Sequence, residues 1–340
     1  YGTRGTNGVI IITTKRVKGE MKPTITVNSY ISTQKITKKL DMLTADEYRQ
    51  KVSEGVAGAV DYKGSTDWLD EILQTPFNQT YSVDLKGGSN KTSYIASLEY
   101  TSNEGLVKHS KVEVLYPRIN VVHRMWDNKL KLEAQLSGYH RTYGIPYDSN
   151  VYKGALLYNP TYSLKNEDGT WNEHGSGPLL SNPVARLEEA KGDNKDTKLK
   201  MYGKATLTPI SGLSFTALGS KEIDNFFGGY YETKQHPSNT INALNGFASR
   251  TTTRIQNDLL ELTAQYTNRF NQHSINALAG YSWNNYNYQY AYMENRDFST
   301  DDYTWNNKGQ GADLTTGTAA MRTSQHRSPL ERYFARANYN

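Results

Sequence analysis

The chain has no cysteine among its 340 residues. Disulfide frameworks, thiolate metal sites and cysteine nucleophiles are therefore excluded. Long apolar runs are also missing, since none approaches the roughly 18 consecutive residues that a transmembrane helix needs. This second absence does not exclude a membrane, because the strands of a transmembrane barrel alternate apolar and polar residues and so keep the average hydropathy low.

Motifs for catalysis and nucleic-acid binding are scarce as well. The seven histidines form no H-E-x-x-H pair, and no RNP-type or zinc-finger pattern occurs. Adjacent carboxylates at 188–189 and 301–302 point in different directions on a helix or a strand, so we interpret them as solvated charges rather than acid–base partners. The sequence predicts neither an enzyme nor a nucleic-acid-binding protein.

Metal ligands are equally sparse. We interpret His174 beside Glu173 as a solvated pair in a loop rather than a metal site. Calcium binding by the loop acids Glu167, Asp168 and Glu173 stays open, although these residues lack the spacing of an EF-hand loop. Beyond that unsupported calcium site, we predict no cofactor and no metal centre.

Tyrosine is the residue in excess. The chain has 26 tyrosines against 8 phenylalanines and a hydrophobic content of 36%, and its mean hydropathy is −0.74. These values are low for a soluble core and suit strands that face water on one side and an interface on the other. The net charge of +5 comes from dispersed Lys and Arg, which we interpret as solvated surface.

The chain opens with a glycine-punctuated loop that runs into a short apolar strand, YGTRGTNGVIIITTKR. Residues 9–12 are all β-branched, which predicts a strand buried on both faces. A strand follows the glycines where a dinucleotide fingerprint or a P-loop would need a helix. The chain begins at Tyr1 without a start methionine or signal peptide, so we expect a longer parent.

This opening closely resembles the plug-end signature of the SusC/RagA family of TonB-dependent outer-membrane transporters. The residues that carry the signature are Tyr1, Gly2, Arg4, Asn7 and Gly8, followed by the Ile-Thr-Thr-Lys string. Further resemblances to the family occur at residues 159–171, 182–189, 276–281 and 333–339. The resemblance thus covers nearly the whole chain.

After the opening, the pattern predicts strands. We expect them at residues 23–33, 78–87, 91–102, 111–125, 129–141, 198–208, 213–222, 251–270, 273–293 and 332–340. In the third, Tyr94, Ala96, Leu98 and Tyr100 share one face, with the apolar centre and aromatic ends typical of a strand that crosses a bilayer.

Two helices are expected between these strands. Thr44 and Glu47 form a capping box, and Gly55 ends the first helix. Asn182-Pro183 opens the second, which we expect to close at Gly192.

The predicted connections alternate between short and long. Brief turns lie near residues 89, 127, 211 and 271, and longer connections begin near 34, 103, 142, 223 and 294. Outer-membrane barrels show this asymmetry, with short periplasmic turns and long extracellular loops. A soluble sandwich has no reason to produce it.

The resemblance implies an all-β fold, a transmembrane antiparallel barrel of about 22 strands around a plug. Residues 1–20 would end the plug, and residues 21–340 would form about ten N-terminal strands of the barrel with long extracellular loops. The chain would be an internal segment; a complete ten-stranded barrel is the less favoured alternative. Such a segment is not expected to fold alone, because its sheet has two unpaired edges.

The family's function is active uptake of large nutrients, glycans or peptides, across the bacterial outer membrane. By resemblance, TonB supplies the energy through a segment absent here, a SusD-like surface lipoprotein forms the lid, and lipid surrounds the barrel. Two other classes stay open: a soluble β-rich carbohydrate-binding or glycan-cleaving domain, and a porin or adhesin without a plug. The opening stretch argues against the latter.

Aromatic residues are the candidates for substrate contact. Tyr286, Tyr288, Tyr290 and Tyr292 share one face of a strand, opposite to the apolar positions in 275–279, and would face the lumen if no bulge intervenes. An aromatic girdle or packing between strands is the favoured alternative interpretation. The loop aromatics Trp171, His174, Tyr230 and Tyr231 are weaker candidates, because such residues more often pack within loops.

Overall fold

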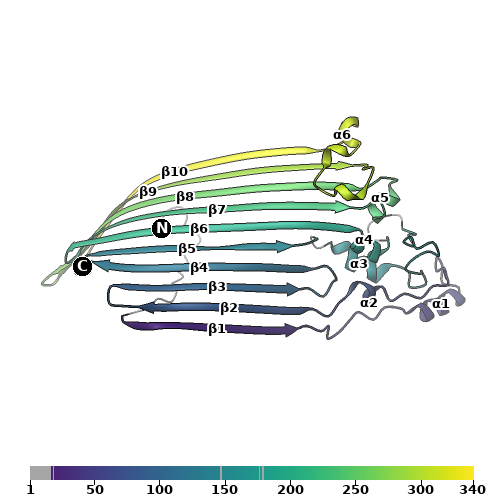
Figure 1. Ribbon diagram of the computed structural model, residues 1–340, viewed down its shortest axis with the longest axis horizontal. Helices are drawn as coiled ribbons and strands as arrows, with labels where there is room; N and C mark the ends of the chain where they lie inside the picture. The colour runs from purple at the N-terminus through teal and green to yellow at the C-terminus, as the bar shows by residue number, and fades with distance from the viewer. Residues whose placement is uncertain (1–16, 18, 146–147, 176, 178–179) are drawn as a thin grey trace.

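The computed structural model describes residues 17, 19–145, 148–175, 177 and 180–340 (Figure 1). The signature residues Tyr1, Gly2, Arg4, Asn7 and Gly8 lie outside these ranges, so the end of a plug at residue 20 stays a prediction. The first described strand, β1 (Met21–Thr33), begins where the barrel was expected to begin.

Ten antiparallel strands form one sheet in which each strand pairs with its neighbours in the chain (Figure 1). The other strands are β2 (Phe77–Gly88), β3 (Thr92–Glu104), β4 (Lys111–Met125), β5 (Leu130–Tyr143), β6 (Ala190–Ile210), β7 (Leu213–Glu232), β8 (Phe247–Phe270), β9 (His273–Arg296) and β10 (Met321–Tyr339). Within the described ranges, β1 and β10 each pair on one side only. The all-β architecture is confirmed, and this portion is an open sheet rather than a closed ten-stranded barrel.

Short and long connections lie at opposite ends of the strands (Figure 1). Tight turns join β2 to β3, β4 to β5, β6 to β7 and β8 to β9. In the second of these, Trp126, Asp127 and Asn128 have φ of 54°, 50° and 67°, the left-handed values that reverse the chain within a few residues. The longer connections lie at the other end of the strands. They are residues 34–76, 105–110, 144–189, 233–246 and 297–320. The predicted asymmetry is confirmed.

The helices are short and lie in the long connections. They are α1 (Ala45–Ser53), α2 (Trp68–Ile72), α3 (Ser149–Leu157), α4 (Pro183–Glu188), α5 (Pro237–Ile241) and α6 (Asp313–Thr316), with the 3-10 turns η2 (Asp301–Tyr303) and η3 (Lys308–Gln310). The capping box of α1 is confirmed, since the Glu47 N–H donates to Thr44 Oγ1 at 3.3 Å and the Thr44 N–H donates to Glu47 Oε2 at 2.8 Å. In the described part of the chain, none of the helices has the length and hydropathy that crossing a bilayer would require.

Several predicted ends of helices and strands are wrong where these elements meet the long connections. Helix α4 ends four residues before Gly192, which lies in β6. Strand β6 begins at Ala190 rather than at 198, and β7 continues to Glu232 rather than to 222. These segments are rich in Gly, Asn and Asp and so resemble loops in sequence. Residues 223–232 nevertheless pair with both β6 and β8, and residues 190–197 pair with β7 along their whole length and with β5 from Asn194 onward. Tertiary pairing therefore overrides their low strand propensity.

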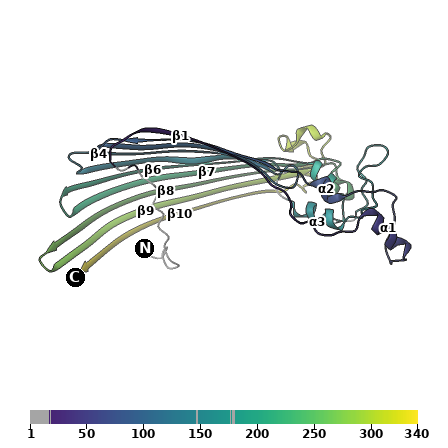
Figure 2. The same cartoon turned by 90° about the horizontal axis from the view of Figure 1, so that it is seen from below.

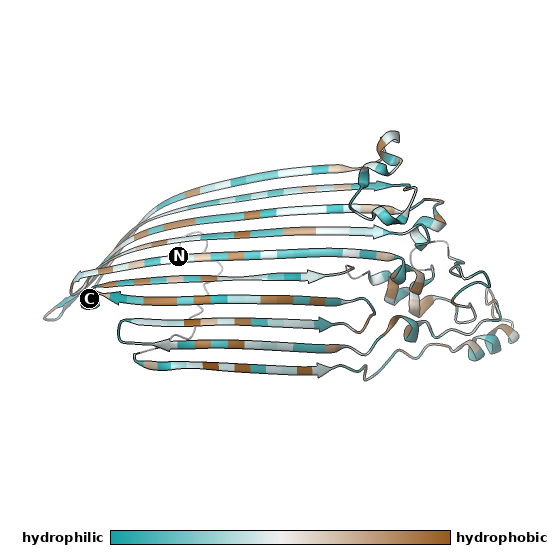
Figure 3. Cartoon of the chain, in the orientation of Figure 1, coloured by the Kyte–Doolittle hydropathy of each residue, from teal (hydrophilic) through white to brown (hydrophobic). Residues whose placement is uncertain are grey.

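One face of the sheet carries a band of exposed apolar side chains, which we call the apolar belt. Figure 3 shows apolar and polar positions alternating along several of the strands. The pairing registers place on this face Ile25, Val27, Val83, Leu98, Leu115, Ile119, Leu132, Leu136, Leu199, Met201, Phe215, Leu260, Leu262 and Tyr333. The predicted set of Tyr94, Ala96 and Leu98 lies within it, paired with β4 residues 121, 119 and 117. Exposed apolar patches of this extent mark a membrane or protein interface.

The belt has a sharp limit toward the long connections. On β8 its last member is Leu260, and the next position on the same face, Asp258, forms an ion pair of 3.0 Å with Lys221. The stretch 260–270 below it matches the about 9–11 residues that a tilted strand needs to cross a bilayer core. The strands therefore continue well above the belt.

The opposite, inner face is polar. Arg141 lies 2.6 Å from Asp196, and Lys198 lies 2.6 Å from Glu222, so ion pairs connect β5 to β6 and β6 to β7. A sheet that is apolar on one face and charged on the other separates hydrocarbon from water. This sidedness is what the predicted barrel wall requires.

Substitution of a belt residue by a cation should disrupt assembly selectively. Leu262→Arg places a charge in the belt, where a bilayer midplane imposes about 2–4 kcal/mol. We expect the full-length variant to show reduced recovery in membranes and a lower urea midpoint after refolding in lipid. Gln265→Arg, on the inner face of the same strand, is the control and should behave as wild type. Equal behaviour of the two variants would contradict the assignment of the faces.

Candidate functional site

The long connections fold into an ordered layer above the sheet rather than into separate loops. Helices α2, α3 and α4 pack around an apolar core formed by Trp68, Leu69, Ile72, Val151, Ala155, Tyr158, Val184 and Leu187. Trp68 is 2% exposed, and its indole Nε1 donates to the Asn159 carbonyl at 3.0 Å. The Tyr158 ring meets the indole edge-on at 5.0 Å between centroids. This core fixes three segments that are far apart in the sequence.

Backbone hydrogen bonds lock connection 34–76 to connection 144–189. The Gly64 N–H donates to the Thr161 carbonyl at 2.7 Å, and the Thr66 N–H donates to the Pro160 carbonyl at 3.0 Å. Thr161 is fully buried, and its hydroxyl also accepts the N–H of Tyr62 at 3.0 Å. The two connections therefore behave as one folded unit.

A second cluster lies on the apolar-belt side of the sheet, above the belt. Figure 2 shows the segment between β9 and β10 on one side of the sheet and α1–α3 on the other. Phe298 packs on Tyr231 and Ala248, and the indole of Trp305 covers Gly229. Asp301 accepts hydrogen bonds from the Tyr231 hydroxyl at 2.8 Å and from the Lys234 N–H at 3.1 Å. Its interpretation as a solvated charge is therefore wrong.

Glu189 joins connection 144–189 to the segment that follows β7. Its carboxylate accepts the Trp171 Nε1–H at 2.7 Å and the Thr233 hydroxyl at 2.5 Å. Glu188, the neighbouring acid, instead contacts His109 at 3.0 Å on the exposed side. The two carboxylates point apart as expected, but Glu189 is a structural acceptor rather than a solvated charge.

A buried polar centre lies beside α4. Arg186, which is 7% exposed, donates to Asp148 at 3.2 Å. Burial, with the charge of Arg186 nearby, lowers the pKa of His236 to about 3. The Nδ1 of this neutral ring accepts the Ser238 N–H, so its 3.4 Å contact with Glu232 is not an ion pair. The centre holds the connection after β7 in place at neutral pH.

The predicted loop residues Trp171 and His174 lie in the layer formed by connection 144–189. The indole of Trp171 is held by Glu189 and covered by Lys165, whose Nζ lies 4.4 Å from the ring centroid. His174 stacks on Tyr162 with 4.3 Å between centroids and 9° between planes, and Tyr62 lies on the same tyrosine. Burial raises the pKa of Tyr162, so its phenol stays neutral. These rings pack in the layer, and their contact with a substrate stays a prediction.

Tyr230 and Tyr231 lie at the end of β7, not in a connection as predicted. Their side chains point to opposite faces, since they are neighbours in a strand. Tyr231 is fully buried under Phe298, which makes it a packing residue as placed. The Tyr230 hydroxyl donates to Glu232 at 2.9 Å on the inner face. The prediction of their location failed because Gly228 and Gly229 resemble a loop.

The tyrosine ladder has the placement that its prediction requires. The pairing of β8 with β9 runs from Phe247↔Arg296 to Phe270↔His273 without irregularity, so no bulge changes the face. Tyr286, Tyr288, Tyr290 and Tyr292 therefore lie on the inner face. They point away from the face that carries the belt, so they do not form a girdle at the bilayer surface. Substrate contact by the ladder stays a prediction.

A groove in the loop layer was not predicted. It has a volume of about 540 Å³ and lies between residues 39–45, residues 65–69 and residues 155–160. Leu40, Met42 and Leu43 are exposed beside it, and an ion pair of Lys39 with Asp70 spans its rim. The sequence holds no signal for this groove, because it arises from the locking of two connections about a hundred residues apart.

The open calcium hypothesis receives no support from the geometry. Asp168 accepts hydrogen bonds from Thr170, while Glu173 accepts the backbone N–H groups of Gly175 at 2.7 Å and Asn182 at 2.9 Å. Across the described ranges, no group of three or more His, Asp or Glu side chains is placed to hold a metal ion. Asp168 and Glu173 thus accept hydrogen bonds that shape the local backbone.

Glu189 should control the order of the loop layer. Glu189→Ala leaves the Trp171 indole and the Thr233 hydroxyl without their acceptor, and each lost bond to a charged group costs about 1.5–3 kcal/mol. We expect faster amide exchange in residues 161–175 and 233–246 of the full-length protein, measured by hydrogen–deuterium exchange. Glu188→Ala, the matched control, should leave both segments protected. Unchanged exchange in the Glu189 variant would contradict the bridging role.

Comparisons with known proteins agree with this architecture, although no family model matches the chain. TonB-dependent receptor P3 of Formosa agariphila is 28% identical over 354 residues, covering 100% of this chain and 34% of the receptor. TonB-dependent receptor SusC of Bacteroides thetaiotaomicron is 32% identical over 193 residues, 54% of this chain and 19% of SusC. The chain thus spans about a third or less of the curated relatives it matches.

Solved structures support the same fold. A chain of the RagAB peptide importer in its "closed-closed" state superposes with a TM-score of 0.76 at 22% identity, covering 100% of this chain and 42% of that one. The open–open state of the same importer matches equally well. The ten-stranded sheet and its one apolar face agree with these similarities, which identify the chain as similar to SusC-type TonB-dependent receptors over its described length.

Proposed function

We propose that this chain forms part of the barrel wall and extracellular loop layer of an outer-membrane transporter that takes up large nutrients. The observation that carries the proposal is the apolar belt, which runs unbroken across the sheet and is covered by no part of the described chain. A soluble carbohydrate-binding or glycan-cleaving domain would pack such a surface against a second layer. The belt therefore favours the transporter over this alternative.

The substrate would be a glycan or a peptide. The half-buried rings along the inner face and the half-buried amides of β8 and β9 suit stacking and hydrogen bonding to either class. Among the relatives, the RagAB structures are described as a peptide importer. The ordered loop layer would form the extracellular mouth of the transporter.

Partner proteins would supply the energy for uptake and control the access of substrate to the barrel. We infer that a TonB-type protein drives uptake and that a SusD-like lipoprotein covers the loop layer, as in the family that the sequence resembles. The rigid, cross-locked connections would supply a fixed docking platform, since interface backbones in such complexes change little on binding.

The proposal is tested by uptake and fractionation of the full-length parent in its own cells. We expect the protein in the outer-membrane fraction, co-purification of a lipoprotein, and growth on the substrate that is lost when either the transporter or TonB is deleted. Ligand recovered with the purified protein and identified by mass spectrometry would distinguish glycan from peptide. Recovery of the parent in the soluble fraction would refute the proposal.

The tyrosine ladder should contribute to substrate affinity. Replacing Tyr288 and Tyr290 by Ala removes two rings from the inner face, and each stacked ring contributes about 0.5–1.5 kcal/mol. We expect weaker substrate binding by roughly fivefold to a hundredfold, measured by calorimetry on the full-length protein. Gln289→Ala, on the outward face between them, is the control and should bind normally. Unchanged affinity of the double variant would leave the rings as packing residues.

A further inference from the structure

Basic side chains gather on the outward face of the sheet just above the apolar belt. We call Lys221, Arg254 and Arg327 the basic cluster; they come from β7, β8 and β10. Lys221 pairs with Asp258, the first position above the belt on β8, and Arg254 lies four residues further along that strand. Arg327 pairs with Asn287 on the outward face of β9. The cluster thus extends from the upper margin of the belt to two same-face repeats above it.

The cluster carries an excess of positive charge. The outward carboxylates nearby are Asp258, which is paired with Lys221 at 3.0 Å, and Glu331, in register with Trp283. Arg250 lies higher on the same face, with its guanidinium 4.5 Å from the Phe227 ring centroid. From the row of Arg250 down to the belt, the outward face of β6–β10 also holds Lys195 and Asp193, which form an ion pair of 2.9 Å. Five basic groups and three acidic ones therefore lie among the described residues of this surface.

These cations are available to a ligand. The side chain of Arg254 is exposed, and among the described residues it forms no ion pair. Arg327 uses Nε to donate to Asn285 at 3.0 Å, which leaves its terminal nitrogens free to bind an anion. The side chain of Lys221 is 45% exposed despite its contact with Asp258.

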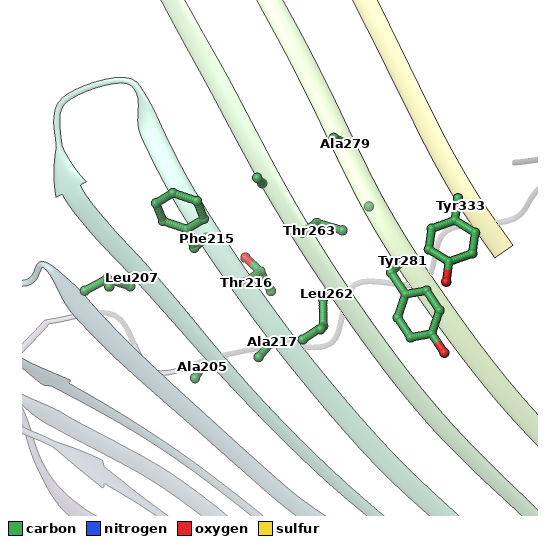
Figure 4. A pocket seen from close by; sticks show the side chains of 12 residues that line it. Ala205, Leu207, Phe215, Thr216, Ala217, Leu262, Thr263, Ala279, Tyr281 and Tyr333 are labelled. Carbon is green, nitrogen blue, oxygen red and sulfur yellow. The ribbon is translucent and has the colours of Figure 1, made fainter. Parts of the chain in front are cut away.

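Below the cluster, the belt is hollowed. Its centre carries small residues, Ala134, Gly203, Ala205, Ala217, Gly219, Ala264 and Ala279, between larger ones. Two hollows of about 760 Å³ and about 610 Å³ result, and Figure 4 shows the second, bounded by Phe215 and Tyr333. Lys221 lies at the rim of the first. An apolar recess therefore adjoins a cationic margin.

The geometry points to a specific occupant. We propose that the basic cluster binds the anionic phosphate headgroup of an outer-leaflet lipid whose acyl chains lie in the hollows of the belt. The proposal rests on the proposed location of the chain in the outer membrane. Arginine pairs with phosphate through two parallel hydrogen bonds. The basic cluster should therefore bind a headgroup with a net negative charge more tightly than a zwitterionic or neutral one.

The depth of the cluster matches that of lipid phosphates. The headgroup layer extends about 5–7 Å beyond the hydrocarbon core on each side. Positions on one face of a strand repeat every 7 Å or so, so Lys221, one repeat above Leu260, falls within this layer. Arg327 lies one repeat above Lys221 and Arg254 lies two, and both have long side chains that can extend down along the sheet toward the phosphate.

The test uses the full-length protein purified in detergent and native mass spectrometry with added lipids. Phosphatidylglycerol and phosphatidylcholine of identical acyl chains are the probes, with inorganic phosphate as a third arm. Wild type should retain phosphatidylglycerol preferentially. The triple variant Lys221→Gln, Arg254→Gln, Arg327→Gln should lower that affinity by about tenfold or more, since each basic group near an anionic lipid contributes about fivefold. Lys204→Gln, Arg332→Gln, Arg336→Gln removes equal charge from the inner face and should leave retention unchanged.

Three outcomes would overturn the inference alone. These are equal retention of the two lipids by wild type, equal phosphatidylglycerol affinity in wild type and cluster variant, and occupancy of the cluster by inorganic phosphate without lipid retention. A change from dimer to monomer in the cluster variant, with lipid retention unaltered, would assign the surface to a second copy instead. Recovery of the wild-type protein from the soluble fraction would refute the proposed function and this inference together.

Discussion

Residue-for-residue pairing between neighbouring strands is the constraint on which this structure depends. Side chains alternate between faces with a period of two, so a slip of one residue in any strand would exchange its apolar and polar faces. The pairing of β8 with β9 runs through both strands without irregularity, and the shifts elsewhere lie near strand ends, at 21–24 and 207–210. The same pairing satisfies the backbone groups, as hydrocarbon requires. The same strand pairing therefore produces both the separation of apolar from polar side chains and the hydrogen bonding of the backbone.

Above the belt, the strands are subject to a different constraint. Both faces of the extended strands meet water or loops, so alternation is no longer required and glycine and asparagine become acceptable. Order there comes from contacts between distant segments, such as the hydrogen bonds around Thr161 and the bridge from Glu189 to Trp171 and Thr233. The result is a rigid layer whose groove and inner-face tyrosines are held by the sheet below.

The parts predictable from sequence were those with local causes. Alternation at Tyr94, Ala96 and Leu98 fixed a strand and its face, and Thr44 with Glu47 fixed a helix start, because each signal lies within a few residues. The upper ends of β6 and β7 could not be predicted, since their pairing partners, rather than their composition, keep them extended. The role of Glu189 likewise depends on two residues brought near only by the fold. The aromatic sites could be placed on a face, but no local pattern separates a packing ring from a binding one.

The central claim is that alternate residues of each strand meet lipid and water, and single-cysteine labelling along β9 tests it most directly. The chain has no native cysteine, so substitutions at 276–280 introduce single probes into this segment. In the membrane-embedded full-length protein, positions 277 and 279 should react with a lipid-soluble maleimide and 276 and 278 with a charged, water-soluble one. Uniform labelling along the strand, or protection of 277 and 279 from both reagents by a second layer of protein, would contradict the account.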